Sequence, residues 1–170
     1  MNDKLYSLSF VCTGNICRSP MAEVIFNELA HAKNLPYRAQ SFGIGPWHVG
    51  QDMDNRARRV LKLKGYDPPR HFAKQIKRGQ IPEGLLLAMD QSHLRDLNKL
   101  VGEIKADIQL GSQVFEKKAM LLMQFASDSK ISEVPDPYYG DEEDFSLSCE
   151  LTEKGCMGLI DRIVSGSDGQ

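Results

Sequence analysis

The sequence lacks the features that mark membrane-spanning and secreted chains. Its longest apolar runs, residues 85–89 and 119–123, are far shorter than the roughly 20 residues that a membrane-spanning helix needs. The first eleven residues have neither a basic start nor a small-residue cleavage site, so they do not resemble a signal peptide. We therefore expect no membrane association and a cytoplasmic location.

Cysteine is also scarce, with four among 170 residues, which is too few for a disulfide scaffold. Cys12 and Cys17 form a C-x4-C pair, and Cys149 and Cys156 form a C-x6-C pair. Neither spacing matches a common zinc motif. We therefore expect no structural metal site.

No excess of positive charge is present, since 21 Lys and Arg residues stand against 23 Asp and Glu residues, for a net charge of −2. This balance does not predict capture of nucleic acid or of an anionic membrane. Any site for an anion has to be a local feature of the chain.

Three common cofactor and metal motifs are missing as well. There is no G-x-x-x-x-G-K-[ST] loop for nucleotide phosphates and no H-E-x-x-H zinc motif. A G-x-G-x-x-G pattern begins at Gly43 and Gly45, but His48 occupies the third glycine position. A dinucleotide site is therefore not supported.

Strand and helix patterns alternate along the chain, as in proteins with a parallel sheet covered by helices. The length predicts a single domain, residues 1–164, followed by a flexible tail, 165–170. The predicted strands are residues 5–11, 37–44, 85–89 and 119–126. The predicted helices are a segment from Pro20 to Ala32 with Ser19 as its N-cap, 55–64 with Gly65 as its C-cap, 91–101, and about 151–164. Glu142, Glu143 and Asp144 are interpreted as solvated first-turn residues of the last helix, and residues 103–118 stay ambiguous.

The loop CTGNICRS, residues 12–19, follows the first predicted strand, where open parallel sheets bind their ligands. Gly14 and Asn15 tolerate left-handed backbone, so the loop can turn its amide groups inward around an anion. The dipole of the following helix points at the same place. Arg18 adds a planar fork that suits a phosphate, and these groups favour Cys12 as a thiolate nucleophile.

The C-x5-R spacing of Cys12 and Arg18 is a weak signal by itself. Cys156 and Arg162 have the same spacing inside a predicted helix, where their side chains lie about 120° apart around the axis and cannot meet at one ligand. What distinguishes the first pair is the preceding strand, the turn residues between them, and the helix start that follows.

Long segments of the chain resemble the low-molecular-weight protein tyrosine phosphatase family. VCTGNICRSPMAEVIF resembles the family signature, and DPYYGDEEDF, residues 136–145, resembles its distant acid loop. SFGIGPWHVG, DNRARRVLKLKG, HFAKQI and LLLAMD match between them in the same order. The resemblance implies a flavodoxin-like α/β sandwich of three layers, with a four-stranded parallel sheet and helices on both faces. Residues 103–118 are longer than the family usually has there.

The resemblance also implies a reaction, hydrolysis of phosphotyrosine in proteins through a phosphocysteine intermediate, with no metal or other cofactor. Cys12 is the implied nucleophile, and Arg18 stabilises the transition state. Asp136, between Pro135 and Pro137 and therefore on extended backbone, is the implied general acid. Phosphate and vanadate are expected to compete as anions.

The remaining implied site residues fall into two groups. Substrate binding is assigned to Thr13, Gly14, Asn15, Ile16, Cys17, Ser19, Trp47, Tyr138 and Tyr139. Ser41 and His71 are assigned to a network that supports the loop together with Asn15 and Ser19, and Ser19 also donates to the Cys12 thiolate. His31, His48 and His93 are given no role.

Several alternatives stay open at this level. A protein arginine phosphatase tends to carry Thr where this chain has Ile16. An arsenate reductase needs further relay cysteines, and none lies between Cys17 and Cys149. A cysteine phosphoryl carrier would need neither Arg18 nor Asp136. Cys17 is either a loop-filling residue or, as the resemblance supports, a redox partner that forms a disulfide with oxidised Cys12.

Overall fold

The computed structural model describes residues 6–102 and 105–165 of the chain. Its helices and strands alternate from β1 to α3, and three consecutive strands and two helices follow. They are β1 (Leu8–Cys12), α1 (Arg18–Ala32), β2 (Ala39–Gly43), α2 (Asn55–Leu63), β3 (Leu85–Ala88), α3 (Gln91–Val101), β4 (Lys105–Leu110), β5 (Gln113–Lys117), β6 (Ala119–Leu121), the 3₁₀ helix η1 (Leu122–Phe125) and α4 (Glu142–Ser165).

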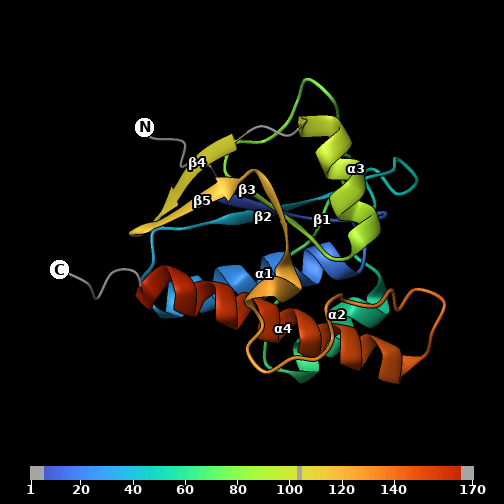
Figure 1. The fold of residues 1–170 in the computed structure, drawn as a ribbon. Coiled ribbons are helices and arrows are strands. Elements are labelled where there is room, and N and C mark those ends of the chain that lie inside the picture. Colours follow the sequence, from blue (N-terminus) through green and yellow to red (C-terminus); the bar gives the residue numbers. More distant parts are fainter. Residues whose placement is uncertain (1–5, 103–104, 166–170) are drawn as a thin grey trace.

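The main sheet has four parallel strands in the order β2-β1-β3-β6, and β4 and β5 form a separate antiparallel hairpin. Helices α1, α2 and α4 lie on one side of the main sheet, and α3 lies on the other (Figure 1). This is the three-layer, flavodoxin-like arrangement, so the fold predicted from the sequence is confirmed.

The central strands are almost entirely apolar, with Ser9 as the exception, because both of their faces are covered. Along β3, Leu85 and Leu87 join the larger core beneath α1 and α4, whereas Leu86 and Ala88 join a smaller core beneath α3. Every residue of β1 and β3 is buried. Helices on both faces hold β1 rigidly, and the loop that leaves its carboxyl end therefore starts from a fixed point.

Two local predictions are wrong. Ser19 is not the N-cap of α1, because Cys17 takes that position and the Ser19 hydroxyl contacts the Cys12 sulfur instead. The apolar run at 119–126 forms a strand only over Ala119–Leu121, and η1 follows, packed against α4. A short buried apolar run does not by itself distinguish a strand from a helical turn.

Several boundaries move while the elements stay. Helix α2 ends at Leu63, one residue before the predicted end, and Gly65 follows with a φ of 90°. Helix α4 begins at Glu142, so the three acidic residues are its first turn, as interpreted. The Asp141 side chain accepts from the backbone N–H of Glu143 and Asp144 and caps this end. Of the predicted tail, Ser165 is the last residue of α4, and 166–170 lie outside the described residues.

The ambiguous segment contains the β4–β5 hairpin, although its residues 103 and 104 lie outside the described part of the chain. Leu110 and Phe115 are buried, and the Phe115 ring meets the Phe125 ring edge to face. The Gly111 N–H donates to the Tyr37 hydroxyl, which places the hairpin turn near the amino end of β2, away from the carboxyl end of β1 (Figure 1). No helix in the described part of the chain is both long and apolar enough to cross a membrane.

Candidate active site

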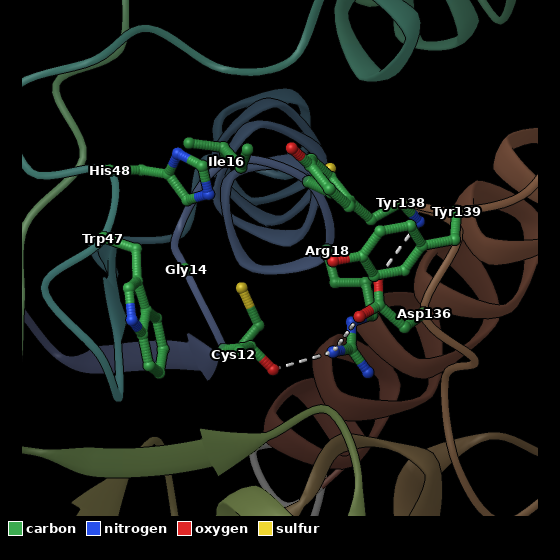
Figure 2. A pocket seen from close by; sticks show the side chains of 11 residues that line it. Cys12, Gly14, Ile16, Arg18, Trp47, His48, Asp136, Tyr138 and Tyr139 are labelled. Atoms are coloured by element: carbon green, nitrogen blue, oxygen red, sulfur yellow. Dashed lines mark hydrogen bonds and ion pairs between the residues drawn. The ribbon is translucent and has the colours of Figure 1, made fainter.

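A pocket of about 350 Å³ opens where β1 ends (Figure 2). Its wall contains residues of the β1–α1 loop, of the loop after β2, and of the loop before α4. They are Cys12, Thr13, Gly14, Ile16, Cys17, Arg18, Trp47, His48, Asp136, Tyr138 and Tyr139. Three segments far apart in the sequence therefore meet around the Cys12 thiol, as the carboxyl end of a parallel sheet favours.

Asn15 fixes the shape of the β1–α1 loop. Its φ of 60° lies in the left-handed region, and it is fully buried. Its side-chain amide donates to the hydroxyl oxygens of Ser19 and Ser41, both at 2.9 Å, and its backbone carbonyl oxygen lies 2.8 Å from His71 Nε2. Burial lowers the pKa of His71 despite that contact. These side chains brace the loop from behind, so Asn15 and Ser19 do not line the pocket itself.

The Cys12 side chain is 97% buried, and its Sγ lies 2.9 Å from Ser19 Oγ. The single Ser19 proton has a second acceptor, the Phe42 carbonyl oxygen, at 3.2 Å. A thiolate is the stronger acceptor of the two because it carries a charge. Asn15 donates to the Ser19 oxygen and so does not compete for the Ser19 proton. When Cys12 is ionised, we therefore expect this proton to point at the sulfur and stabilise its charge.

The Arg18 guanidinium contacts four other residues. Its Nη1 donates to Asp90 Oδ2 at 2.8 Å and to the Val134 carbonyl at 3.0 Å. Its Nη2 donates to Thr13 Oγ1 at 3.3 Å and lies 3.5 Å from Asp136 Oδ2. With Nη1 committed to Asp90 and Val134, the Nε proton and the second Nη2 proton are the guanidinium donors that remain for an anion, and a pair of this kind can bind two phosphoryl oxygens.

Asp90 supplies the negative charge that Arg18 needs in this buried position. Burial opposes ionisation of its carboxyl, but hydrogen bonds from the Ser92 hydroxyl and the His93 backbone, together with His93 and Arg18, outweigh it and lower the pKa to about 2. Asp90 therefore remains a carboxylate near neutral pH. It is also the N-cap of α3, so one residue ties the β3 end, the helix and the arginine together.

Asp136 lies across the pocket from Cys12, at its open side (Figure 2). Its side chain is 46% exposed, and its Oδ1 accepts from the Tyr138 backbone N–H at 3.1 Å. The flanking prolines hold this turn. A carboxyl group in this place can reach both an oxygen atom bound to phosphorus and a water molecule.

Aromatic side chains surround the mouth of the pocket. The Tyr138 and Tyr139 rings meet edge to face at 4.9 Å, and Trp47 lies on the other side (Figure 2). Trp47 is 65% exposed and Tyr139 is 95% exposed. His48, which was given no role, also lines the pocket, and its ring lies 6.1 Å from that of Tyr138. A flat aryl group can enter between these rings.

Sequence reasoning missed the contribution of the β3–α3 connection. Asp90 pairs with Arg18, and His93 Nε2 lies 2.8 Å from Thr13 Oγ1. The available signal was position, because Asp90 directly follows a buried strand whose carboxyl end lies beside that of β1.

The four cysteines separate into two pairs. Cys12 and Cys17 both line the pocket, and burial, together with the nearby Asp54 carboxylate, raises the pKa of Cys17. Cys149 and Cys156 are buried in α4, away from the pocket, and the Cys156 thiol faces the Ala22 carbonyl oxygen. Among residues 6–102 and 105–165, no three His, Cys, Asp or Glu side chains are grouped as metal ligands.

Comparison with known proteins agrees with this arrangement. Residues 7–167 match the family model described as low molecular weight phosphotyrosine protein phosphatase. The chain is 38% identical over 163 residues to low molecular weight protein-tyrosine phosphatase A of Mycobacterium tuberculosis, covering 95% of this chain and 93% of that protein.

Solved structures give the same result. A protein tyrosine phosphatase from Entamoeba histolytica superimposes with a TM-score of 0.82 at 30% identity, covering 95% of this chain and 98% of that one. YfkJ from Bacillus subtilis superimposes with a TM-score of 0.81 at 31% identity over the full length of both chains. The chain therefore belongs to the low molecular weight phosphotyrosine protein phosphatase family.

Proposed function

We propose that this protein hydrolyses phosphotyrosine in proteins through a phosphocysteine intermediate. The observation that carries the proposal is the convergence of three groups on one pocket: the Cys12 sulfur, the free edge of the Arg18 fork and the Asp136 carboxyl. A nucleophile, a holder for the phosphoryl oxygens and a group that can move a proton are the parts that this reaction needs.

In the first step the phosphoryl group of the substrate lies in the β1–α1 loop, with its oxygens on backbone amides and on Arg18. The Cys12 thiolate attacks phosphorus, forming the S–P bond as the bond from phosphorus to the tyrosine oxygen breaks. Asp136 enters this step protonated and gives its proton to the departing oxygen, so that tyrosine leaves as a neutral phenol.

In the second step Asp136, now a carboxylate, takes a proton from a water molecule as that water attacks the phosphorus of phosphocysteine. The S–P bond breaks, inorganic phosphate forms, and Cys12 leaves as a thiolate. The Ser19 hydroxyl, 2.9 Å from this sulfur, stabilises the charge that returns to it. Asp136 thus serves as the acid in the first step and as the base in the second.

The depth of the pocket supports tyrosine over serine. Cys12, which carries the reacting sulfur, is 97% buried, and Trp47, Tyr138 and Tyr139 lie around the mouth of the pocket. A phenyl ring is long enough to carry its phosphate from the mouth to the sulfur, and its faces contact the aromatic walls. The short side chain of phosphoserine keeps its phosphate close to the peptide backbone.

The alternatives on this fold receive less support. Cys149 and Cys156 lie in α4 and do not line the pocket, so they are not placed to relay the disulfide that an arsenate reductase requires. A phosphoryl carrier has no use for Asp136 beside the pocket. Ile16, which lines the pocket, gives an apolar contact for an aryl ring rather than a hydroxyl for a guanidine.

We also propose a cytoplasmic location. The mechanism needs a reduced nucleophile, and all four cysteines are free thiols. A reducing compartment keeps them in that state.

Initial rates on matched phosphotyrosine, phosphoarginine and phosphoserine peptides, measured in EDTA, test the proposal. We expect turnover of phosphotyrosine well above the other two, with competitive inhibition by phosphate and by vanadate. Ile16→Thr should shift relative activity toward phosphoarginine. Preferred turnover of phosphoarginine or phosphoserine by the parent protein would contradict the proposed substrate.

A further inference from the structure

His93 is a buried histidine that the reaction steps above do not use. It lies in the first turn of α3, beneath the Thr13 end of the β1–α1 loop, and only 2% of it is exposed. Its Nε2 lies 2.8 Å from Thr13 Oγ1, although the two residues are 80 positions apart in the sequence. A histidine so far inside the protein needs its polar atoms matched by partners.

Thr13 connects this histidine to Arg18. The Nη2 of Arg18 donates to Thr13 Oγ1 at 3.3 Å, so one lone pair of the hydroxyl is already occupied. The Thr13 proton therefore has to point away from Arg18 toward an acceptor. His93 Nε2 is at hydrogen-bond distance, and it is such an acceptor only if it carries no proton.

The surroundings of the other ring nitrogen favour that state. Burial and the charge of Arg18 lower the pKa of His93 to about 4, so the ring is neutral near neutral pH and carries one proton. Its Nδ1 lies 3.3 Å from Asp90 Oδ1, without hydrogen-bond geometry to any partner in the described part of the chain. A proton on Nδ1 faces the carboxylate favourably, whereas a bare lone pair there would face another negative atom.

We propose that His93, with its proton on Nδ1, is a positioning residue that directs the Thr13 hydroxyl so that Thr13 holds Nη2 of Arg18. Asp90 and Val134 fix Nη1, and His93 acts through Thr13 on the other arm of the same fork. This inference rests on the proposed function only in that it assigns Arg18 to the phosphoryl group. The directions of the hydrogen bonds among His93, Thr13 and Arg18 do not depend on the proposed function.

The proton position can be measured without any substrate. In protein labelled with ¹⁵N at histidine, two-bond ¹⁵N–¹H correlations distinguish the two neutral tautomers, and His93→Gln identifies which signals belong to His93. We expect a neutral ring at pH 6 to 7 with the proton on Nδ1. A proton on Nε2, or a doubly protonated ring in this range, would overturn the proposal.

Two substitutions of similar size separate the two nitrogens. A glutamine carries its amide near the place of Nε2, so His93→Gln keeps an acceptor for Thr13, whereas His93→Asn places its amide near Nδ1 and leaves Thr13 without one. We expect His93→Gln to retain most of kcat/KM on phosphotyrosine peptide and His93→Asn to lose roughly 5- to 10-fold, the scale of one hydrogen bond. Equal losses in both variants would contradict a role through Nε2.

A double-mutant cycle with Thr13→Val decides whether His93 acts through that hydroxyl. His93→Asn should cost little further activity when Thr13→Val is already present, because both remove the same interaction. Leu97→Ala, one turn further along α3 and also fully buried, is the control for lost stability and should leave kcat/KM unchanged. Additive losses in the cycle would overturn the inference, while absence of phosphotyrosine turnover in the parent would count against the proposed function alone.

Discussion

The floor and the rim of the pocket are built in opposite ways. The floor, defined as Cys12 and Arg18 together with Asn15 and Ser19, which brace them from behind the pocket, is at least 97% buried, and each of these side chains has a hydrogen-bond partner in the protein. The rim, defined as Trp47, Tyr138 and Tyr139, is more exposed. Trp47 and Tyr139 are exposed to solvent, whereas Tyr138 is half-buried and its ring contacts Tyr139, His48 and Arg56.

This difference separates chemistry from selection. The floor meets the same phosphoryl group in every substrate, so preorganised donors in a buried place lower the barrier of every reaction alike. The rim meets the variable part of the substrate, where the aromatic rings contribute contact area but no group that takes part in the reaction. We therefore expect floor variants to lose turnover of all substrates and rim variants to change the ranking of substrates.

The largest effect is expected at the centre of the floor. Cys12→Ser should abolish turnover while phosphate and vanadate still bind, because the loop amides and Arg18 remain in place. Isothermal titration with each anion and a rate assay check the two parts. Cys156→Ala, which changes a cysteine with the same C-x5-R spacing in α4, should keep normal kcat. Appreciable turnover by Cys12→Ser would place the nucleophile elsewhere.

Asp136 stands between floor and rim, and its effect should depend on the substrate. Asp136→Ala should slow aryl phosphates with poor leaving groups by about 10²- to 10⁴-fold, the range for one general acid, and those with good leaving groups far less. A series of phenyl phosphates with phenol pKa values spread over several units measures this. A penalty independent of the leaving group would remove Asp136 from the role of acid.

Asp90, in the connection after β3, pairs with Arg18 of the floor, and its removal should affect stability as well as rate. Asp90→Asn leaves the buried Arg18 guanidinium without its carboxylate, and breaking such a buried pair costs roughly 3–5 kcal/mol. Both kcat and the free energy of unfolding should fall, as urea titration and rate measurements would show. A variant with normal stability and normal kcat would mean that Val134 and Thr13 suffice to hold the fork.

The pH dependence of stability gives a second measure of the same pair. Because the folded pKa of Asp90, about 2, lies below the unfolded value, its contribution is fully present above about pH 4 and is lost as pH falls toward 2. The contribution is on the order of 2 kcal/mol. In Asp90→Asn the decrease in stability between pH 4 and pH 2 should be smaller than in the parent. An identical decrease would contradict the low pKa.

The same contrast explains which features the sequence predicted. The β1–α1 loop is continuous in sequence, so the order of strand, turn residues and helix start indicated its anion site, and the resemblance supplied Asp136. Asp90 and His93 contact residues of that loop from the β3–α3 connection and α3. Their position after a buried strand indicates the edge of the sheet where they lie, but it does not identify the residues that they contact. The register of β1 against β3 brings them together, and only the folded chain provides it.

Local sequence patterns also gave wrong predictions where a residue has a partner that is distant in the sequence. Ser19 has the ordinary character of an N-cap, but Cys12 and Asn15 occupy its hydroxyl. The 119–126 run has the composition of a strand, but its second half packs beneath α4 as η1. The β4–β5 hairpin stayed ambiguous because the burial of its inner residues comes from contacts with distant parts of the chain.

A substitution at Gly45 can displace the Trp47 ring of the rim without changing the tryptophan itself. A Cβ built on Gly45 would overlap the six-membered ring of Trp47, which packs directly over it. Because Trp47 is 65% exposed, its ring can swing outward at little cost, so Gly45→Ala should fold normally. KM for aryl phosphates should rise a few-fold, the scale of one aromatic contact, while inhibition by inorganic phosphate stays the same.

Trp47 is the single tryptophan of the chain, so its fluorescence reports the displacement directly. Gly45→Ala should change the emission maximum and the accessibility of the indole to acrylamide. In a Trp47→Ala background the same substitution should leave KM unaltered. If Gly45→Ala raised KM equally in that background, Gly45 would act through the loop rather than through the ring.

The smallest effect on turnover is expected at Cys17, which borders the floor and takes no part in phosphoryl transfer. Burial raises the pKa of its thiol, and the nearby Asp54 carboxylate raises it further, so Cys17 stays protonated while Cys12 reacts. Peroxide should oxidise the Cys12 thiolate to a sulfenic acid, and attack by the Cys17 sulfur should release water and leave a disulfide between the two.

Peroxide is therefore expected to inactivate the enzyme, bound phosphate to slow the loss, and dithiothreitol to restore activity. Cys17→Ser should keep normal kcat but recover poorly, because its sulfenic acid has no neighbouring thiol and is oxidised irreversibly. Cys149→Ser is the matched control, since that thiol is buried in α4 outside the pocket, and it should recover like the parent. Mass spectrometry of the peptide that holds residues 12 and 17 tests the bond itself. If the inactive parent contained no such disulfide, or if Cys17→Ser recovered fully, Cys17 would be only a residue that fills the loop.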